Sequence, residues 1–268
     1  MIQEPGRILH NTKVGSVYYR MGLACSGQYE EASPGQFVMI HAGEGVPLLP
    51  RPFSIHRLVM SGGRVTGIEI LYKVVGIGTQ KMSSTRKGDT IRVLGPLGSG
   101  FRVMDGVRRV FVIAGGIGVA PLFFLIERIL AKGVDPRECH LFLGGKTSKD
   151  VLCHDDFDKM GVRIVLTTDD GSAGNQCLVT HPAEMAADKD PPDIIFACGP
   201  AGMLACVAQI AAKLNVLCQV SVETIMACGI GACMGCAVDG QDPDRYLHVC
   251  RDGPVFDSRL LKWGSIYS

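Results

Sequence analysis

The sequence predicts a multidomain protein in three parts: an N-terminal antiparallel β-barrel, a central α/β domain with a parallel sheet, and a small irregular C-terminal segment. Three observations support this prediction. Short β-branched and apolar runs, separated by glycine and proline turns, fill residues 1–103. Apolar strands alternate with helical stretches over residues 104–223. Residues 224–268 are rich in glycine and cysteine and follow neither pattern.

In the first part, strands are expected at residues 14–24, 36–41, 65–72 and 90–94. Many short strands in about a hundred residues are typical of a sandwich or a small barrel. In the second part, strands are expected at residues 110–114, 139–143, 163–167, 194–197 and 219–222. Helices are expected at residues 120–132, where Pro121 suits a first turn, and at 201–214.

Composition excludes several classes of protein. The formal net charge of +1 and the absence of a basic run argue against a nucleic-acid partner. Glycine and proline interrupt the two long uncharged stretches, residues 110–126 and 194–212, so we expect no membrane span. The first ten residues have no apolar segment, so no signal peptide is expected.

Eleven cysteines, an odd number, argue against a secreted disulfide framework. We therefore expect a reducing compartment, the cytoplasm. Five cysteines lie in apolar runs and are interpreted as buried small hydrophobic residues: Cys25, Cys139, Cys198, Cys206 and Cys218.

The strongest motif is a group of four cysteines near the C-terminus, in the pattern C-x4-C-x2-C followed by a fourth after thirteen residues. They are Cys228, Cys233, Cys236 and Cys250. This is the spacing of plant-type [2Fe–2S] ferredoxins, in which four thiolates bind the two irons. Three glycines let the chain wrap closely around a cluster: Gly229, Gly231 and Gly235. A structural zinc site is the alternative, but zinc prefers paired short spacings, and here the first gap is four residues.

Three ordered motifs in the barrel half indicate a flavin site. The first is Arg51-Pro52-Phe53-Ser54, in which an arginine can grip a pyrophosphate and a hydroxyl can bond the isoalloxazine edge. Alone, it also fits a strand with a surface arginine. Residues 71–79 follow, ending in Gly78-Thr79, where backbone amides can approach phosphates, and residues 95–98 form a rigid turn. The three motifs in this order are improbable by chance.

Glycines in the α/β half indicate a nicotinamide dinucleotide site. Gly115, Gly116 and Gly118 follow a strand and open a helix, where a pyrophosphate can approach the helix N-terminus. A tightly packed strand–helix turn is the alternative. The run Cys198-Gly199-Pro200 ends a later strand, at the edge where open α/β sheets bind ligands. Lys146 and Lys149 follow another strand, but they do not establish a site for a 2′-phosphate, so NADP stays open.

These motifs resemble the ferredoxin–NADP reductase superfamily, whose barrel binds FAD through an R-x-[YF]-S motif. With the cysteine cluster added, the whole chain resembles the electron-transfer subunits of class 1B dihydroorotate dehydrogenases. The resemblance also covers residues 34–37, 169–172 and 252–256. It favours NAD and implies that Cys198 lies beside the nicotinamide. It implies FAD contacts at Arg51, Pro52, Phe53, Ser54, Leu71, Tyr72, Lys73, Gly78 and Thr79.

Function follows from the combination of sites. Hydride exchange with nicotinamide moves two electrons and an iron–sulfur cluster accepts one, whereas FAD can do both. We find no acid–base pair outside these motifs, so no catalytic residue for a carbon substrate is predicted here. The resemblance implies an FMN-containing catalytic partner that oxidises dihydroorotate to orotate in pyrimidine biosynthesis. It implies electron flow from FMN through the cluster and FAD to NAD+, in a heterotetramer of two of each subunit.

Two alternatives remain. A related FAD/[2Fe–2S] subunit can serve a ferredoxin:NADP transhydrogenase or a sulfide dehydrogenase, and the co-purifying partner would distinguish these. A non-enzymatic redox sensor or adaptor with a reductase-like fold would lack flavin absorbance bands.

Overall fold

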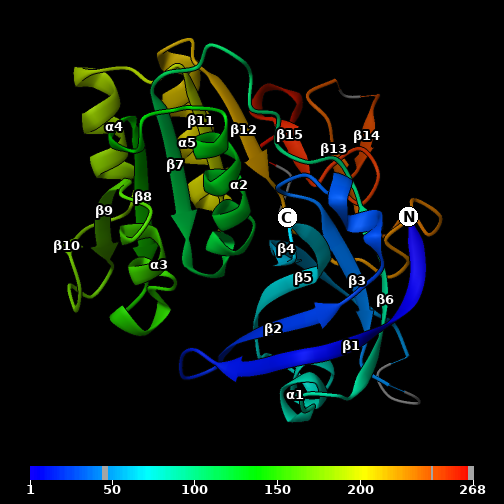
Figure 1. The fold of residues 1–268 in the computed structure, drawn as a ribbon. Coiled ribbons are helices and arrows are strands. Elements are labelled where there is room, and N and C mark those ends of the chain that lie inside the picture. Colours follow the sequence, from blue (N-terminus) through cyan, green and yellow to red (C-terminus); the bar gives the residue numbers. More distant parts are fainter. Residues whose placement is uncertain (44–47, 243, 265–268) are drawn as a thin grey trace.

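The computed structural model describes residues 1–43, 48–242 and 244–264. Figure 1 shows the three predicted parts: a barrel coloured blue to cyan, an α/β unit coloured green to yellow, and a C-terminal segment coloured orange to red. The C-terminal segment lies beside both other parts: its strand β15 (Val255–Asp257) pairs with β12 (Leu217–Ser221) of the sheet, and Gly229 contacts Met39 of the barrel. The predicted fold class is confirmed.

The first part is a closed antiparallel barrel of six strands. They are β1 (Ile2–Lys13), β2 (Tyr18–Ala24), β3 (Phe37–His41), β4 (Arg51–Ser61), β5 (Arg64–Lys73) and β6 (Thr90–Leu97). Their order around the barrel is β1-β2-β5-β4-β3-β6. A short 3-10 helix, η1 (Gly27–Glu31), follows β2, and α1 (Ile77–Ser84) connects β5 to β6.

Sequence patterns missed two barrel strands and misplaced the start of a third. Strand β1 contains Pro5 and Gly6, and β4 contains Pro52, so neither has a strong strand signal. Residues 14–17, expected to begin a strand, form the connection from β1 to β2. Barrel closure explains the difference, since each strand gains a hydrogen-bonded neighbour on both sides whatever its own propensity.

The second part is a seven-stranded sheet flanked by helices. Its strands are β7 (Val110–Gly115), β8 (Cys139–Gly145), β9 (Arg163–Thr168), β10 (Asn175–Gln176), β11 (Ile194–Cys198), β12 (Leu217–Ser221) and β15 (Val255–Asp257). Their order is β10-β9-β8-β7-β11-β12-β15, parallel throughout except for β15. The helices are α2 (Val119–Ala131), α3 (His154–Asp158), α4 (Thr180–Lys189) and α5 (Ala201–Lys213). Short 3-10 turns are η2 (Gly116–Gly118), η3 (Pro136–Glu138) and η4 (Ser148–Asp150).

The strand order places a switch point at the centre of this sheet. From β7 the chain moves outward to β10, then returns to β11 on the other side of β7. Ligands of open α/β sheets bind in the crevice at such a switch point, outside the carboxyl ends of the strands. Here those ends carry Gly115 and Cys198, as the sequence predicted.

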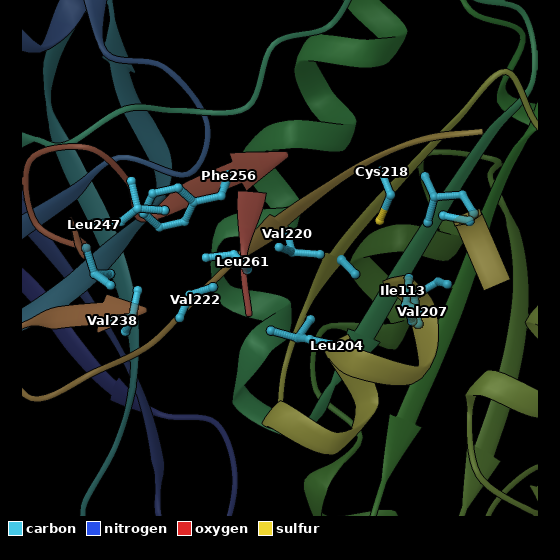
Figure 2. Packing of buried hydrophobic residues seen from close by; sticks show 14 of the residues in the cluster. Ile113, Leu204, Val207, Cys218, Val220, Val222, Val238, Leu247, Phe256 and Leu261 are labelled. Carbon is cyan, nitrogen blue, oxygen red and sulfur yellow. The ribbon is translucent and has the colours of Figure 1, made fainter. Parts of the chain in front are cut away.

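The C-terminal segment is more regular than expected. It contains a hairpin of β13 (Ala237–Asp239) and β14 (Tyr246–His248), the strand β15, and the 3-10 turn η5 (Ser258–Leu260). Figure 2 shows its apolar side chains, including Val238, Leu247 and Phe256, in one view with Val220 of β12 and Leu204 of α5. All belong to one buried cluster, so the segment folds onto the sheet and not as an independent unit.

Barrel and sheet meet where α2 packs on β4. The ring nitrogen Nδ1 of His56 donates to the carbonyl of Ala120 over 2.8 Å, and the imidazole is fully buried. Phe124 of α2 extends into the barrel core. Burial lowers the pKa of His56 to about 3, so the ring is neutral at physiological pH.

Two further expectations concern the burial of five cysteines and the absence of a membrane-spanning helix. All eleven thiols are free. Cys139, Cys198 and Cys218 are buried as predicted, but the interpretation is wrong for Cys25 and Cys206, which are only half-buried. In the described parts of the chain, no helix combines the length and apolar character needed to cross a bilayer.

We predict that acid destabilises the fold through His56. Its pKa is depressed by folding, so the unfolded chain binds a proton that the folded chain excludes, and stability falls as pH drops from about 6.5 toward 3. The free energy of unfolding should be about 2 kcal/mol lower at pH 5 than at pH 7.5. Urea unfolding of wild type and His56→Asn measures this. An equal pH dependence in the variant would show that another group is responsible.

Candidate flavin, nicotinamide and iron–sulfur sites

The first cavity, of about 490 Å³, lies between β4, β5, the start of α1 and the chain after β12. All nine residues expected to contact FAD line it: Arg51, Pro52, Phe53, Ser54, Leu71, Tyr72, Lys73, Gly78 and Thr79. Its volume is in the range of small-molecule sites. The structure therefore brings three separated motifs together, and FAD contact by each residue stays a prediction.

Arg51 lies at the open rim of this cavity. Its Nη1 donates to the carbonyls of Leu49 and Pro50 over 2.9 and 3.2 Å. Arg51 is exposed and is among the residues that line the cavity, and a guanidinium can bind a pyrophosphate through two parallel hydrogen bonds.

Thr79 shapes the loop before α1. Its hydroxyl oxygen accepts from the amides of Val75 and Gly76 over 2.9 and 3.1 Å and donates to the carbonyl of Gly76. The hydroxyl is thereby used within the chain. The donors left for a phosphate are backbone amides at the helix start, beside Gly78.

Tyr72 lines the first cavity, and its hydroxyl is already hydrogen-bonded within the barrel. Its hydroxyl donates to Asn11 Oδ1 over 3.0 Å, inside the barrel, and its ring packs edge-on against Phe53 with the centroids 5.9 Å apart. Burial raises the pKa of Tyr72 well above its usual value. A neutral aromatic wall of this kind suits an apolar planar group such as isoalloxazine.

The second cavity, of about 670 Å³, lies over the carboxyl ends of β7 and β11. Five of the six predicted dinucleotide residues line it: Gly115, Gly116, Gly118, Gly199 and Pro200. The alternative interpretation, a tightly packed turn, also applies, because a methyl group at Gly118 would overlap the carbonyl of Cys198. These glycines are thus needed for packing and at the same time leave an open backbone surface.

Cys198 lines neither cavity among the described residues. It is 1% exposed, beneath the turn that carries Gly118. Burial, and then the nearby carboxylate of Glu223, raise the pKa of its thiol well above the usual value. The thiol is therefore neutral, and its placement beside the nicotinamide stays a prediction.

The two cavities meet at three residues that line both: Lys73, Ile117 and Glu223. Glu223 is solvent-exposed, but the protein atoms around its carboxyl displace part of the surrounding water, and this desolvation raises its pKa. Sequence reasoning did not single out Ile117 or Glu223. A signal existed for Glu223, because it is the second residue after β12, whose carboxyl end lies at the same sheet edge as those of β7 and β11.

The four cysteines of the C-terminal loop converge in two pairs. The thiol of Cys228 lies next to that of Cys233 near the surface, and the thiol of Cys236 lies next to that of Cys250 in the interior. The exposures differ accordingly: Cys233 is exposed, Cys228 is half-buried, and the inner two are each 2% exposed. Such a two-plus-two arrangement suits two irons that each bind two thiolates.

Backbone amides point at these sulfurs. The amide of Ile230 donates to Cys228 over 3.5 Å, and that of Gly231 donates to Cys250 over 3.0 Å. Burial opposes ionisation of Cys228, but the amide bonds outweigh it and lower the pKa of this thiol to about 6. Burial and the adjacent Cys236 raise the pKa of Cys250 to about 12. Amide donors stabilise thiolates and bridging sulfides.

The loop depends on two of the three predicted glycines for its backbone. Gly229 and Gly231 have φ of +74° and +81°, which side chains rarely adopt. Gly235 is not in this region, and a methyl group there would lie 3.6 Å from Cys233 Sγ. Within the described residues, no three His, Cys, Asp or Glu side chains form a set around a single metal ion. Two cysteine pairs fit a binuclear cluster better than a lone zinc.

Two family models and a solved structure match this chain. The chain matches the model of the iron–sulfur cluster binding domain of dihydroorotate dehydrogenase B over residues 223–262 and that of the oxidoreductase NAD-binding domain over residues 112–209. It is 27% identical to an NADH-dependent reduced ferredoxin-NADP oxidoreductase of known structure, with a TM-score of 0.83, covering 97% of this chain and 90% of that one. Fold and sites define an NAD-linked, iron–sulfur electron-transfer oxidoreductase subunit.

Curated relatives identify the family. The dihydroorotate dehydrogenase B (NAD(+)) electron transfer subunit of Caldanaerobacter subterraneus subsp. tengcongensis is 39% identical over 93% of this chain and 94% of that protein. The probable subunit of the same name from Methanopyrus kandleri is 39% identical over 85% of this chain and 80% of that protein. The chain belongs to the family of dihydroorotate dehydrogenase B electron transfer subunits. The resemblance drawn from the motifs is thereby confirmed.

We predict that Gly118→Ala destabilises the sheet edge, because the added methyl group meets a backbone carbonyl that cannot move away. Unfolding should cost about 2 kcal/mol less, a fall of about 4–8 °C in the thermal midpoint. Gly202→Ala is the control, since no part of the described chain lies within 4 Å of its added methyl group and alanine favours the helix. Equal midpoints for both variants would contradict the packing described.

Proposed function

We propose that this chain relays electrons from the FMN of a dihydroorotate dehydrogenase catalytic subunit to NAD+, with a [2Fe–2S] cluster and FAD as its bound carriers. FAD, when bound, supplies exchange between two-electron hydride chemistry and one-electron chemistry. The residues of the first cavity would hold FAD, those of the second would hold NAD, and the four cysteines would hold the cluster.

One observation carries this proposal: a single short segment connects all three sites. Ser221, Glu223 and Met226 line the flavin cavity, Glu223 also lines the nicotinamide cavity, and Cys228 follows two residues after Met226. Two extended residues span at most about 7 Å. The cluster loop therefore begins beside the flavin cavity, which suits short electron-transfer steps.

The protein packs closely around the cluster loop and the flavin cavity and excludes water from both. Gly229 packs on Met39 of β3, so the barrel wall lies directly beneath the cluster loop. Cys236 and Cys250 are nearly inaccessible to solvent, and Phe37, Val222 and Met226 make the adjoining flavin cavity mainly apolar. Solvent exposure is one of the factors that set the reduction potential of a bound carrier, so this exclusion of water would tune both sites.

Oxidation of dihydroorotate to orotate would occur in the catalytic partner. The family name implies such a partner, and we propose a heterotetramer containing two copies of each subunit. We also propose a cytoplasmic location, because eleven free thiols suit a reducing compartment. A ferredoxin:NADP transhydrogenase or sulfide dehydrogenase partner would be revealed by isolating the complex.

We predict that Cys233→Ser abolishes electron transfer from dihydroorotate to NAD+, because a cluster ligand is removed. Oxidation of dihydroorotate by an artificial acceptor at the partner's own site should be unchanged. The complex is assayed spectrophotometrically with each acceptor. Cys177→Ser is the matched control, since this half-buried cysteine lies outside the loop. Retention of both activities by Cys233→Ser would refute the relay.

The purified chain tests the redox-sensor alternative. Its visible spectrum should show flavin and iron–sulfur bands that bleach on addition of NADH. A preparation of the whole chain with cluster bands but no flavin would contradict the proposed function.

Exposed apolar residues accompany the outer cysteine pair, Cys228 and Cys233, along the chain. Ile225, Ile230 and Met234 are 86%, 47% and 57% exposed, and all three lie within five residues of Cys228 or Cys233. We propose that this surface docks on the catalytic subunit, because exposed apolar groups cluster where the carrier is nearest to solvent.

Ile230→Glu should weaken association with the catalytic subunit at least tenfold, because docking would bury an unpaired charge. Met185→Glu is the control: Met185 is 75% exposed but lies on α4, away from the loop. Titration of labelled catalytic subunit measures both affinities. Equal affinities would place the interface elsewhere.

A further inference from the structure

The barrel strand β2 contacts the α/β domain through two side chains. The Tyr18 hydroxyl donates to Asp150 Oδ1 over 2.7 Å, and Arg20 Nη2 donates to Asp156 Oδ2 over 2.6 Å. Tyr18 and Arg20 lie on one face of the strand, since side chains two residues apart point the same way. Both acceptors lie between β8 and β9, on η4 and α3.

Asp150 uses both carboxylate oxygens to order the turn after β8. While Oδ1 accepts from Tyr18, Oδ2 accepts from the amide and the hydroxyl of Thr147, each over 3.2 Å. That turn carries Gly145 and Lys146, and both line the nicotinamide cavity together with Asp150 itself. The position of this cavity wall is therefore coupled to Tyr18.

Tyr18 also lies beside the junction of the two cavities. It is 2% exposed and lines the nicotinamide cavity. Lys73 is its partner in the β2–β5 ladder, has its Nζ 5.4 Å from the Tyr18 ring centroid, and lines both cavities. Burial, and then Asp150, raise the pKa of Tyr18, so a neutral phenol donates to a carboxylate in a charge-assisted bond.

Arg20 makes the second connection and is itself held by the barrel. Its Nε lies 3.5 Å from Glu69 Oε1 of β5, while its Nη2 binds Asp156 and lies 3.4 Å from Cys153 Sγ. Cys153 begins α3 with a φ of +60°, a conformation that needs support from its surroundings. Arg20 supplies such support at the start of this helix.

We propose that Tyr18 and Arg20 form an interdomain latch that holds residues 147–156 against the barrel and so positions bound dinucleotide for exchange with the flavin site. Both are positioning residues, acting through Asp150 and Asp156. The inference deepens the proposed function and rests on it for the identity of the dinucleotide.

The test uses the whole chain with its cofactors and NAD+ as the probe. Tyr18→Phe keeps the ring and removes the hydroxyl, and the dissociation constant for NAD+, measured by calorimetry, should rise about tenfold, equivalent to about 1.4 kcal/mol. Stopped-flow reduction by NADH should show a similar rise in apparent KM, with the limiting rate changed less than twofold. Flavin and cluster spectra should be unchanged. Arg20→Met should shift binding in the same direction.

Tyr29→Phe is the matched control. Tyr29 is fully buried in the barrel core, and its hydroxyl has no hydrogen-bond partner among the described residues, so this variant loses a buried phenol oxygen without touching the latch. Its NAD+ affinity should equal that of wild type. A similar weakening in Tyr29→Phe would show that the effect in Tyr18→Phe comes from general softening of the barrel and would overturn the proposal.

A double variant tests the route of action. If Tyr18 acts through Asp150, then Tyr18→Phe combined with Asp150→Ala should bind NAD+ as Asp150→Ala does alone. Additive effects would overturn the positioning role, because Tyr18 would then contact the dinucleotide itself. Unchanged affinity in both Tyr18→Phe and Arg20→Met overturns the latch alone. Wild-type chain that binds NAD+ but is not reduced by NADH contradicts the proposed function and leaves the latch standing.

Discussion

The packing of α2 on β4 is the constraint on which the rest of the structure depends. The buried bond from His56 to the carbonyl of Ala120 and the insertion of Phe124 into the barrel core fix one orientation between barrel and sheet. If the barrel slid relative to the sheet, the buried carbonyl of Ala120 would lose its hydrogen-bond donor, which costs free energy. In this orientation the flavin and nicotinamide cavities share Lys73, Ile117 and Glu223.

The C-terminal segment depends on the same frame. Strand β15 extends the sheet by pairing with β12, and Phe256 and Leu261 join the core that contains Val220 and Val222. Because both ends of the cluster loop are tied in this way, a loop of irregular backbone can keep four sulfurs in two pairs. A free-standing ferredoxin would need a hydrophobic core of its own, whereas this segment packs into the core of the α/β sheet.

Much of this could be predicted from the sequence, because the informative residues carry their chemistry locally. Buried parallel strands such as β7 are continuous apolar runs, and the spacing of the cysteines is itself a ligand pattern. What could not be predicted depends on distant partners. Strand β4 forms despite Pro52 because the barrel closes around it, and Tyr18 meets Asp150 across 132 residues of sequence. No local pattern marks either event.

The two cysteine pairs differ in burial, so the cluster site has one side near solvent and one side in the protein core. The pair nearest to solvent lies among exposed apolar side chains, while Cys236 and Cys250 lie in the core shared with the sheet. Gly229, at the base of the loop, packs on Met39 and so faces the barrel. Under the proposed function, the exposed pair would face the catalytic subunit and the rest of the loop would face the flavin cavity. A carrier placed in a sealed core could not meet a partner, and one placed wholly at the surface would be separated from the flavin. The loop satisfies both requirements because its two ends are anchored to the core while Cys233 stays exposed.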